Sequence, residues 1–273
     1  MYNTMKHFLP TGFGVSLDKD NFELLTSYQV RMLLIKKGFV ILSNTNLDDE
    51  DAFRKLVATY GTVVQYSGEK EHVGYGFKDL LKLNGERDKI ISGRGELPIH
   101  SDGGLLQARV DIVFLYATKI EKMKFQGETI LFDHELAYYE MPQHLKRILD
   151  EETFESRVLE EGYYVDASPK GWFTVPVHNN YGWGSKMLLY FPFTGDNPPS
   201  WESRIHGFTE KEIKNFFEEL NLFFYQPRYC YKHYWKKGNL MIMDNRRVLH
   251  ARKAFDNNSE RIIYRGQTID PEY

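Results

Sequence analysis

"ELPIHSDGGLL", residues 96–106, contains a histidine and an aspartate two positions apart, His100 and Asp102. On an extended strand, residues i and i+2 point to the same face, so this imidazole and this carboxylate can converge on one point. A metal ion suits that arrangement, and so does a simple hydrogen bond between the two side chains. The rest of the sequence decides between the two readings.

A second stretch, "NLMIMDNRRVLHARKAF" (residues 239–255), supplies a third candidate ligand. It begins with an apolar strand that ends at Asp244, and His250 follows the turn. Two imidazoles and one carboxylate on one face of an Fe(II) ion, with the remaining positions open, are the ligand set of non-haem oxygenases. His100, Asp102 and His250 therefore predict an iron site.

The stretch "ERIIYRGQT" (residues 260–268) places Arg261 and Arg265 four positions apart, on one face of a strand. Guanidinium groups in an apolar strand are costly unless they meet anions, and their planar donor forks suit carboxylates. The open positions of the iron would take a bidentate 2-oxo acid and then O2. Arg261, eleven residues after His250, is the candidate anchor for the distal carboxylate of that acid, assisted by the hydroxyl of Thr129. Surface ion pairs of the arginines are the alternative.

Composition narrows the class of protein. The chain has 273 residues, 42% of them hydrophobic, and no linker-like tract divides it, so a single domain over residues 1–273 is expected. The net charge of −3 gives no electrostatic reason to expect a nucleic-acid partner. A single cysteine, Cys230, excludes an internal disulfide and fits a reducing compartment. With no signal-peptide pattern and no apolar run of membrane-spanning length, a cytoplasmic protein without a membrane partner is expected.

Helices are predicted over residues 21–37, ending at Gly38 in a left-handed C-cap, and over residues 48–61. Two further helical patches interrupt a series of short strands and turns. Many short predicted strands with a few helices between them indicate a mainly β fold, a double-stranded β-helix (jelly roll) with peripheral α-helices. The apolar face of the first helix is expected to consist of Leu25, Tyr28, Met32 and Ile35. Strands are expected at residues 110–118, 128–133, 163–168, 172–177, 186–193 and 239–244.

The motifs "LPIHSDG", "GETILFD" and "MDNRRVLHAR", followed by "YRGQT", resemble those of the Fe(II)/2-oxoglutarate oxygenases of the taurine dioxygenase and clavaminate synthase superfamily. Longer segments, such as "EGYYVDASPKGWFTVPV" and "YKHYWKKGNLMIMDNRRVLH", extend the resemblance over nearly the whole chain to its carbapenem-forming members. The resemblance implies Fe(II), 2-oxoglutarate as cosubstrate and O2, with ascorbate as the expected reductant in vitro. It also implies a small β-lactam substrate, (3S,5S)-carbapenam-3-carboxylate. In carbapenem antibiotic biosynthesis this compound is inverted at C5 and desaturated between C2 and C3, giving (5R)-carbapenem-3-carboxylate.

The same resemblance implies roles for further residues. Inversion needs a hydrogen atom delivered from the face opposite an Fe(IV)-oxo species, and Tyr164 matches the tyrosine that donates it. Tyr163 would point to the other side of a strand, so only one of the two fills the role, and a packing role for Tyr164 stays open. Arg252 and Arg265 are candidates for holding the substrate carboxylate, and the sequence does not decide between them. Residues expected to line the substrate pocket, or else to belong to the core, are Tyr66, Tyr190 and Trp201.

Other functions remain compatible with these residues. Asp102 is a carboxylate, whereas related halogenases have Gly or Ala at that position, which disfavours chlorination. A hydroxylase of a small amino-acid-like carboxylate would use the same scaffold without needing Tyr164. A 2-oxoglutarate sensor would bind the same ligands without turnover. Oligomerisation is common in the superfamily, so a homo-oligomer is compatible with the sequence, although no residue pattern indicates an interface.

Overall fold

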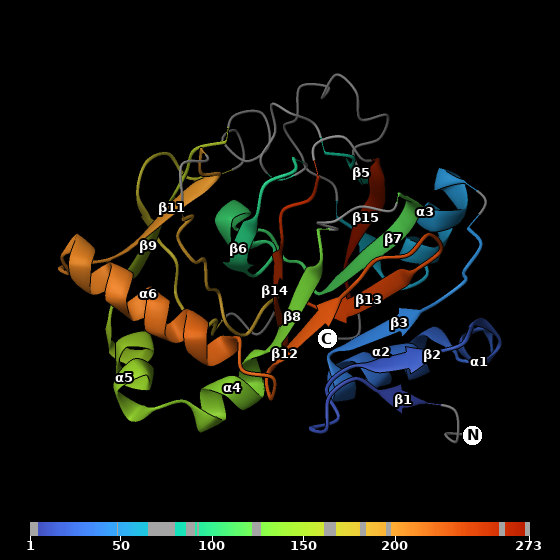
Figure 1. The fold of residues 1–273 in the computed structure, drawn as a ribbon, viewed down its shortest axis with the longest axis horizontal. Helices are drawn as coiled ribbons and strands as arrows, with labels where there is room; N and C mark the ends of the chain where they lie inside the picture. The colour runs from blue at the N-terminus through green and yellow to red at the C-terminus, as the bar shows by residue number, and fades with distance from the viewer. Residues whose placement is uncertain are drawn as a thin grey trace.

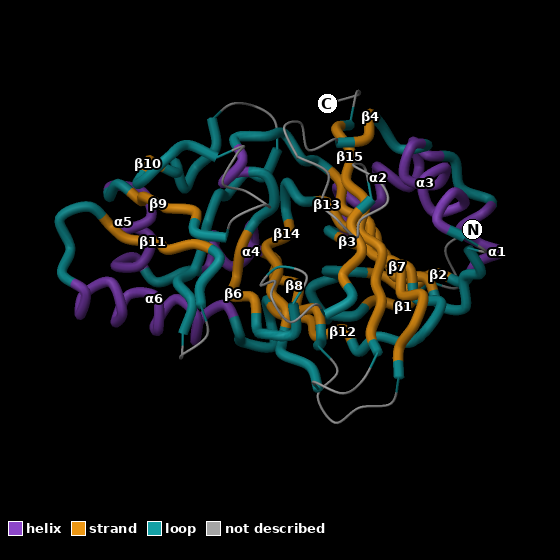
Figure 2. Tube along the Cα trace, turned by 90° about the horizontal axis from the view of Figure 1, so that it is seen from above, coloured by secondary structure: helices purple, strands orange, loops and turns teal. Residues whose placement is uncertain are grey.

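The computed structural model describes residues 5–47, 49–64, 80–85, 91, 93–121, 127–160, 168–180, 184–194, 198–256 and 260–270. Within these ranges the strands form three sheets, and helices pack outside them (Figures 1 and 2). The predicted mainly β architecture with peripheral helices is confirmed. The described strands form separate sheets and not one closed barrel.

The largest sheet has eight strands and carries both arginines of the 260–268 stretch. Its order is β1-β2-β3-β13-β7-β15-β4, and β5 also pairs with β15. Strands β2 and β3 pair in parallel, and the other described pairs are antiparallel. The bounds are β1 Lys6–His7, β2 Val15–Leu17, β3 Phe39–Leu42, β4 Thr62–Val63, β5 Leu81–Leu83, β7 Ile112–Ile120, β13 Leu240–Asp244 and β15 Arg261–Ile269.

A second sheet of four antiparallel strands, ordered β12-β8-β14-β6, carries both histidines of the predicted iron site. The chain alternates between the two sheets: β6, β8, β12 and β14 belong to the small one, and β7, β13 and β15 to the large one. This alternation brings β6 beside β14, although most of the chain separates them. The bounds are β6 Leu97–His100, β8 Thr129–Asp133, β12 Cys230–His233 and β14 Val248–Arg252.

The two-residue period of a strand sorts the side chains of β14 between two environments. Leu249 and Ala251 join the apolar cluster under α6. Val248 belongs to the cluster between the sheets, and His250 and Arg252 line the cavity there. The interior face of the small sheet is therefore part core and part polar site.

Helices cover the outer faces of the eight-stranded and the four-stranded sheet, as Figure 1 shows. Side chains of α2 and α3 pack on the back of the large sheet, and those of α4, α5 and α6 pack on the small one. A third sheet, ordered β10-β9-β11, lies beside α6 (Figure 2). Within the described ranges no helix is both long and apolar enough to cross a lipid bilayer. The remaining bounds are α1 Lys19–Glu23, α2 Ser27–Lys37, α3 Glu50–Ala58, η1 Gly104–Leu106, α4 His134–Glu140, α5 Gln143–Glu151, β9 Phe154–Val158, β10 Phe173–Thr174, β11 Trp201–Ile205 and α6 Glu210–Phe224.

The helix predicted over residues 21–37 is two helices, α1 and α2. The second begins at a capping box: Thr26 Oγ1 accepts from Gln29 N over 3.2 Å, and Gln29 Oε1 accepts from Thr26 N over 2.9 Å. This reciprocal pair satisfies backbone donors at a helix start, so a new helix begins there. Gly38 is the C-cap as predicted, and its φ of +82° is positive, but its ψ of −47° places it outside the left-handed helical region.

The predicted apolar face of this helix is wrong at Tyr28 and Met32, whereas Leu25 packs against the core as predicted and Ile35 is half-buried. Tyr28 and Met32 are 57% and 46% exposed, whereas Val30 and Leu34 are fully buried against the large sheet. Residues 186–193 do not form the predicted strand either. They take part in two isolated bridges, at Met187 and Tyr190. Of the strand predicted at residues 163–168, only the last residue lies within the described ranges.

Candidate iron and 2-oxoglutarate site

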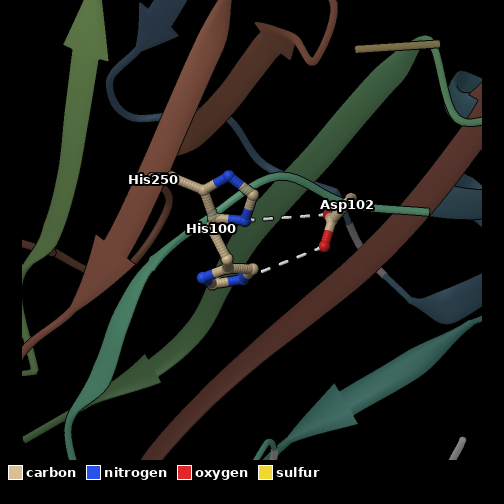
Figure 3. A group of neighbouring side chains, drawn as sticks. All are labelled: His100, Asp102 and His250. Carbon is tan, nitrogen blue, oxygen red and sulfur yellow. Dashed lines mark ion pairs between the residues drawn. The ribbon is translucent and has the colours of Figure 1, made fainter. Parts of the chain in front are cut away.

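Figure 3 shows the three predicted metal ligands side by side. His100 is the last residue of β6, and its register partner across the strand pair is His250 of β14. Asp102 follows β6 by two residues. One ligand atom from each of the three lies within 4.8 Å of the others, and no ligand group of this kind occurs elsewhere in the described ranges.

The spacing within the triad suits a metal better than hydrogen bonds. His100 Nε2 lies 3.9 Å from Asp102 Oδ1, and His250 Nε2 lies 3.7 Å from Asp102 Oδ2. Both separations exceed the range of a hydrogen bond, so the alternative of a direct His100–Asp102 bond is not what the structure has. An ion about 2.1 Å from each ligand atom fits between atoms at this separation.

Hydrogen bonding fixes which nitrogen of His100 can bind a metal. His100 Nδ1 lies 2.8 Å from the carbonyl oxygen of Pro98. Because a carbonyl only accepts, Nδ1 carries the proton, and the lone pair of a neutral His100 is on Nε2, facing Asp102. Burial lowers the pKa of His100, and burial together with the neighbouring His100 lowers the pKa of His250 to about 3. Both imidazoles are therefore neutral near pH 7, the form that binds metal.

Asp102 is held from several directions. Its Oδ2 accepts from Arg265 Nη2 over 2.6 Å and from Gln267 Nε2 over 2.8 Å. Its backbone N–H donates to Asn245 Oδ1 over 3.1 Å, and its carbonyl accepts from Asn245 Nδ2 over 3.0 Å. Burial raises the pKa of Asp102, but the charge of Arg265, followed by the two imidazoles, outweighs it and keeps that pKa below its ordinary value. Asp102 is thus an oriented carboxylate anion.

Sequence reasoning missed Asn245 and Gln267. For Gln267 a signal was present, because it lies two positions after Arg265 and so shares its strand face. Asn245 has no comparable signal, because its role depends on a turn meeting a distant segment.

A cavity of about 590 Å³, including space open to solvent, extends from the triad between the two sheets. Arg261 and Thr129 both line it and are 1% and 5% exposed. Arg261 Nη2 donates to the carbonyl of Gly127 over 3.0 Å, while its Nε and Nη1 have no partner among the described residues. Burial, followed by the charge of Arg252, lowers the pKa of Arg261 well below its ordinary value. The carboxylate of Glu128 acts in the opposite direction. Because no described residue accepts from Nε or Nη1, a carboxylate ligand in the cavity could fill these donors.

The two candidates for the substrate carboxylate also line this cavity. Arg265 forms the ion pair with Asp102 described above. Arg252 donates to the carbonyl oxygens of Ile91 over 2.5 Å and Gly95 over 2.8 Å. Burial lowers the pKa of Arg252 to about 10, with Glu160 acting in the opposite direction, so the guanidinium stays charged at neutral pH.

Of the aromatic residues predicted to line the pocket, one lines the cavity and another lies outside its lining. Trp201 lines the cavity, and its ring lies 5.4 Å from that of His100. Tyr190 is buried beneath the turn after β6, where its hydroxyl accepts from Leu105 N over 3.2 Å, and it is not among the cavity-lining residues. Tyr66 and Tyr164 lie outside the described residues.

Two imidazoles and a carboxylate beside a buried arginine define the class of oxygenase that uses Fe(II) with a 2-oxo acid. Comparison with known families shows to which family of these oxygenases the chain belongs. A model described as "Taurine catabolism dioxygenase TauD, TfdA family" matches residues 6–267. The chain belongs to this TauD/TfdA family. It is an iron- and 2-oxoglutarate-dependent dioxygenase, with His100, Asp102 and His250 as its candidate iron ligands.

Individual relatives are distant. A 3-((Z)-2-isocyanoethenyl)-1H-indole synthase of Fischerella ambigua is 21% identical, with 93% of this chain and 92% of that protein covered. An alpha-ketoglutarate-dependent 2,4-dichlorophenoxyacetate dioxygenase of a Burkholderia species is 28% identical, but the match covers only 62% of this chain and 57% of that enzyme.

Solved structures share the fold at low identity. PvcB of Pseudomonas aeruginosa has a TM-score of 0.68 at 17% identity, covering 95% of this chain and 89% of that one. AAD-2 in complex with Mn(II) and N-oxalylglycine has a TM-score of 0.70 at 15% identity, covering 97% of each chain. At these identities the likeness concerns the fold alone.

Proposed function

We propose that this dioxygenase is a carbapenem synthase. It would bind (3S,5S)-carbapenam-3-carboxylate, invert C5 and desaturate C2–C3, giving (5R)-carbapenem-3-carboxylate. The assignment of this substrate and reaction is supported by the resemblance of the longer sequence segments to carbapenem-forming enzymes. We also propose that the two facing sheets are the two sides of a double-stranded β-helix, because the chain alternates between them from β6 to β8 and from β12 to β15.

The observation that carries the proposal is the charge of the cavity. Its charged lining residues are one carboxylate, Asp102, and three arginines, Arg252, Arg261 and Arg265. Asp102 pairs with Arg265 directly, the carboxylate of Glu160 attracts Arg252, and Arg261 keeps Nε and Nη1 without a hydrogen-bond partner among the described residues. Arg261 is therefore the cation in this lining that most needs an anionic ligand. A cavity lined by three arginines suits a dicarboxylate cosubstrate and a substrate that carries a carboxylate.

Each residue then has a task. His100, Asp102 and His250 would hold Fe(II), which supplies O2 activation and the oxidising power when 2-oxoglutarate is bound. Arg261 and Thr129 would bind the distal carboxylate of 2-oxoglutarate. Arg252 or Arg265 would fix the substrate carboxylate, and Trp201 beside His100 would limit where the substrate ring can lie.

Tyr164 would donate a hydrogen atom to C5 from the face opposite the metal. A Tyr164→Phe variant should still consume 2-oxoglutarate with the substrate but fail to invert C5, since its ring lacks the phenol O–H. Tyr163→Phe is the matched control and should invert C5 normally. Inversion by Tyr164→Phe would remove the role given to Tyr164.

The decisive experiment is an aerobic incubation with Fe(II), ascorbate, 2-oxoglutarate and (3S,5S)-carbapenam-3-carboxylate, following succinate and product mass together. Substrate-dependent succinate with loss of two hydrogens, and then inverted C5 in a chiral assay, is the expected result. Gain of oxygen would identify the hydroxylase of a small carboxylate instead. Iron binding without any succinate would identify a 2-oxoglutarate sensor.

The two substrate arginines can be separated by the KM for the carbapenam. Arg252→Met and Arg265→Met each remove one guanidinium while keeping a long side chain. The variant of the residue that holds the substrate carboxylate should raise this KM by roughly 10-fold or more, as expected for a lost charge-assisted hydrogen bond. The other variant should act mainly on metal retention or on folding.

A further inference from the structure

The hydroxyl of Thr129 has a fixed neighbour, Trp235, which is not among the residues that line the cavity. Trp235 Nε1 lies 3.0 Å from Thr129 Oγ1, and Trp235 is 2% exposed. Trp235 comes two residues after β12, whose His233 is the register partner of Thr129 on β8. The indole also packs edge-on against the His233 imidazole, with ring centroids 4.5 Å apart. Trp235 is thus held in place independently of any ligand.

The chemistry of the two groups fixes the direction of their hydrogen bond. An indole N–H can only donate, so Thr129 Oγ1 must accept. The hydroxyl hydrogen of Thr129 therefore points away from Trp235 and is available to another acceptor. A threonine hydroxyl without this neighbour could instead turn its lone pairs towards nearby donors.

Arg261 supplies the other donors at this end of the cavity. Its Nε and Nη1 carry N–H groups with no partner in the described part of the chain, and a guanidinium has no acceptor. If the Thr129 hydroxyl accepted from Arg261, it would consume one of those donors. With its hydrogen directed outward, Thr129 adds a further donor.

We propose that Trp235 is a positioning residue for the cosubstrate. By engaging one of the two lone pairs of Thr129, it favours the orientation in which the hydroxyl donates into the cavity beside the free donors of Arg261, and a surplus of donors favours a carboxylate over a carboxamide or an alcohol. The proposal rests on the assignment of the distal carboxylate of 2-oxoglutarate to Thr129 and Arg261 made above.

The test measures ligand binding without turnover. Calorimetry of the Mn(II)-loaded enzyme, without O2, gives the Kd for 2-oxoglutarate. Trp235→Phe keeps an aromatic ring but lacks the N–H and should raise this Kd by roughly 3- to 10-fold, the effect of about one hydrogen bond. Thr129→Val should raise it at least as much, and the double variant should bind no worse than Thr129→Val alone. Trp172→Phe, at a tryptophan that stacks against Arg204 and does not line the cavity, should leave the Kd unchanged.

A second ligand separates positioning from general damage. 2-Oxobutyrate has the metal-binding 2-oxo acid but no distal carboxylate, so Trp235→Phe should leave its affinity unchanged. Equal weakening of both ligands, an unchanged Kd for 2-oxoglutarate, or additive effects of the Trp235 and Thr129 changes would each overturn the proposal. If the Phe variant does not fold, benzothienylalanine at position 235, which keeps the ring shape without an N–H, replaces it. A wild type that binds 2-oxobutyrate as tightly as 2-oxoglutarate would instead overturn the carboxylate assignment itself.

Discussion

Gln267 determines how Asp102 presents itself to a metal. Because Gln267 and Arg265 both donate to Oδ2, Oδ1 is the oxygen left for coordination. Gln267→Leu should lower Mn(II) affinity by roughly 10-fold, since groups that orient a ligand typically contribute 10- to 100-fold. Calorimetric titration with Mn(II) measures this, and Gln143→Leu, at the exposed start of α5, is the control. Equal affinities of the two variants would show that Arg265 alone orients Asp102.

His233 should make the protein sensitive to acid. Burial, together with the charge of Arg261, lowers the pKa of His233 to about 4, despite a hydrogen bond between the imidazole and Asn239 that acts in the opposite direction. An unfolded histidine takes up a proton near pH 6.5. Between pH 6.5 and 4 the unfolded state therefore binds a proton that the folded state does not, and stability falls as the pH falls.

The expected loss from this residue between pH 7 and pH 5 is about 1–2 kcal/mol of unfolding free energy. Urea titrations of the metal-free protein at both pH values measure it. His233→Gln should flatten the pH dependence by that amount.

At the level of elements, Gly38 joins α2 to β3 at a point where a side chain does not fit. A Cβ at Gly38 would lie 2.4 Å from the ring of Phe13, which is buried, and φ is +82°. Gly171 has a similar φ of +74° but nothing within 4 Å of such a Cβ. Gly171→Ala should cost about 1–2 kcal/mol from backbone strain alone, and Gly38→Ala should cost about 1–3 kcal/mol more from the clash. Denaturant unfolding of both variants gives the difference, and equal losses would mean that Phe13 can move aside.

The elements also show what the sequence could and could not predict. The even spacing of Arg261 and Arg265 predicted a shared buried face on β15, and both side chains are buried. The break between α1 and α2 could have been predicted from the sequence, because Thr26 and Gln29 have the spacing of a capping box. The continuous apolar pattern of residues 21–37 suggested one helix instead.

Other features depend on which segments meet in space. Val30 and Leu34 satisfy helical spacing as well as Tyr28 and Met32 do, and only packing on the large sheet decides which pair is buried. The Trp235–Thr129 hydrogen bond joins residues 106 positions apart. Such pairings follow from strand register across a sheet, which the local sequence does not specify.

For the whole molecule, the unfilled donors of Arg261 weaken the ligand-free fold. Replacing a buried, incompletely satisfied charge by an apolar side chain of similar length often stabilises a protein by about 1–4 kcal/mol. Arg261→Met should therefore raise the Tm of the ligand-free protein while abolishing the further rise that 2-oxoglutarate gives the Mn(II)-loaded wild type. That rise corresponds to about 2.7 kcal/mol when the ligand is present at 100 times its Kd. Thermal unfolding with and without 2-oxoglutarate tests both parts, and a lower ligand-free Tm would mean that the guanidinium stabilises the fold unaided.

The pairing of β6 with β14 brings together ligands that are 150 positions apart in the sequence. Closing a loop of that length in a flexible chain would cost about 4 kcal/mol of conformational entropy. In the folded protein the pairing of β6 with β14 offsets this cost, so metal binding does not have to. An unfolded chain would hold an ion only through its His-x-Asp segment. Retention of the ion thus reports on long-range order: separation of β14 from β6 breaks the ligand set even while every helix remains formed. A bound metal ion would serve as a built-in probe of whether the two ends of that loop are still together.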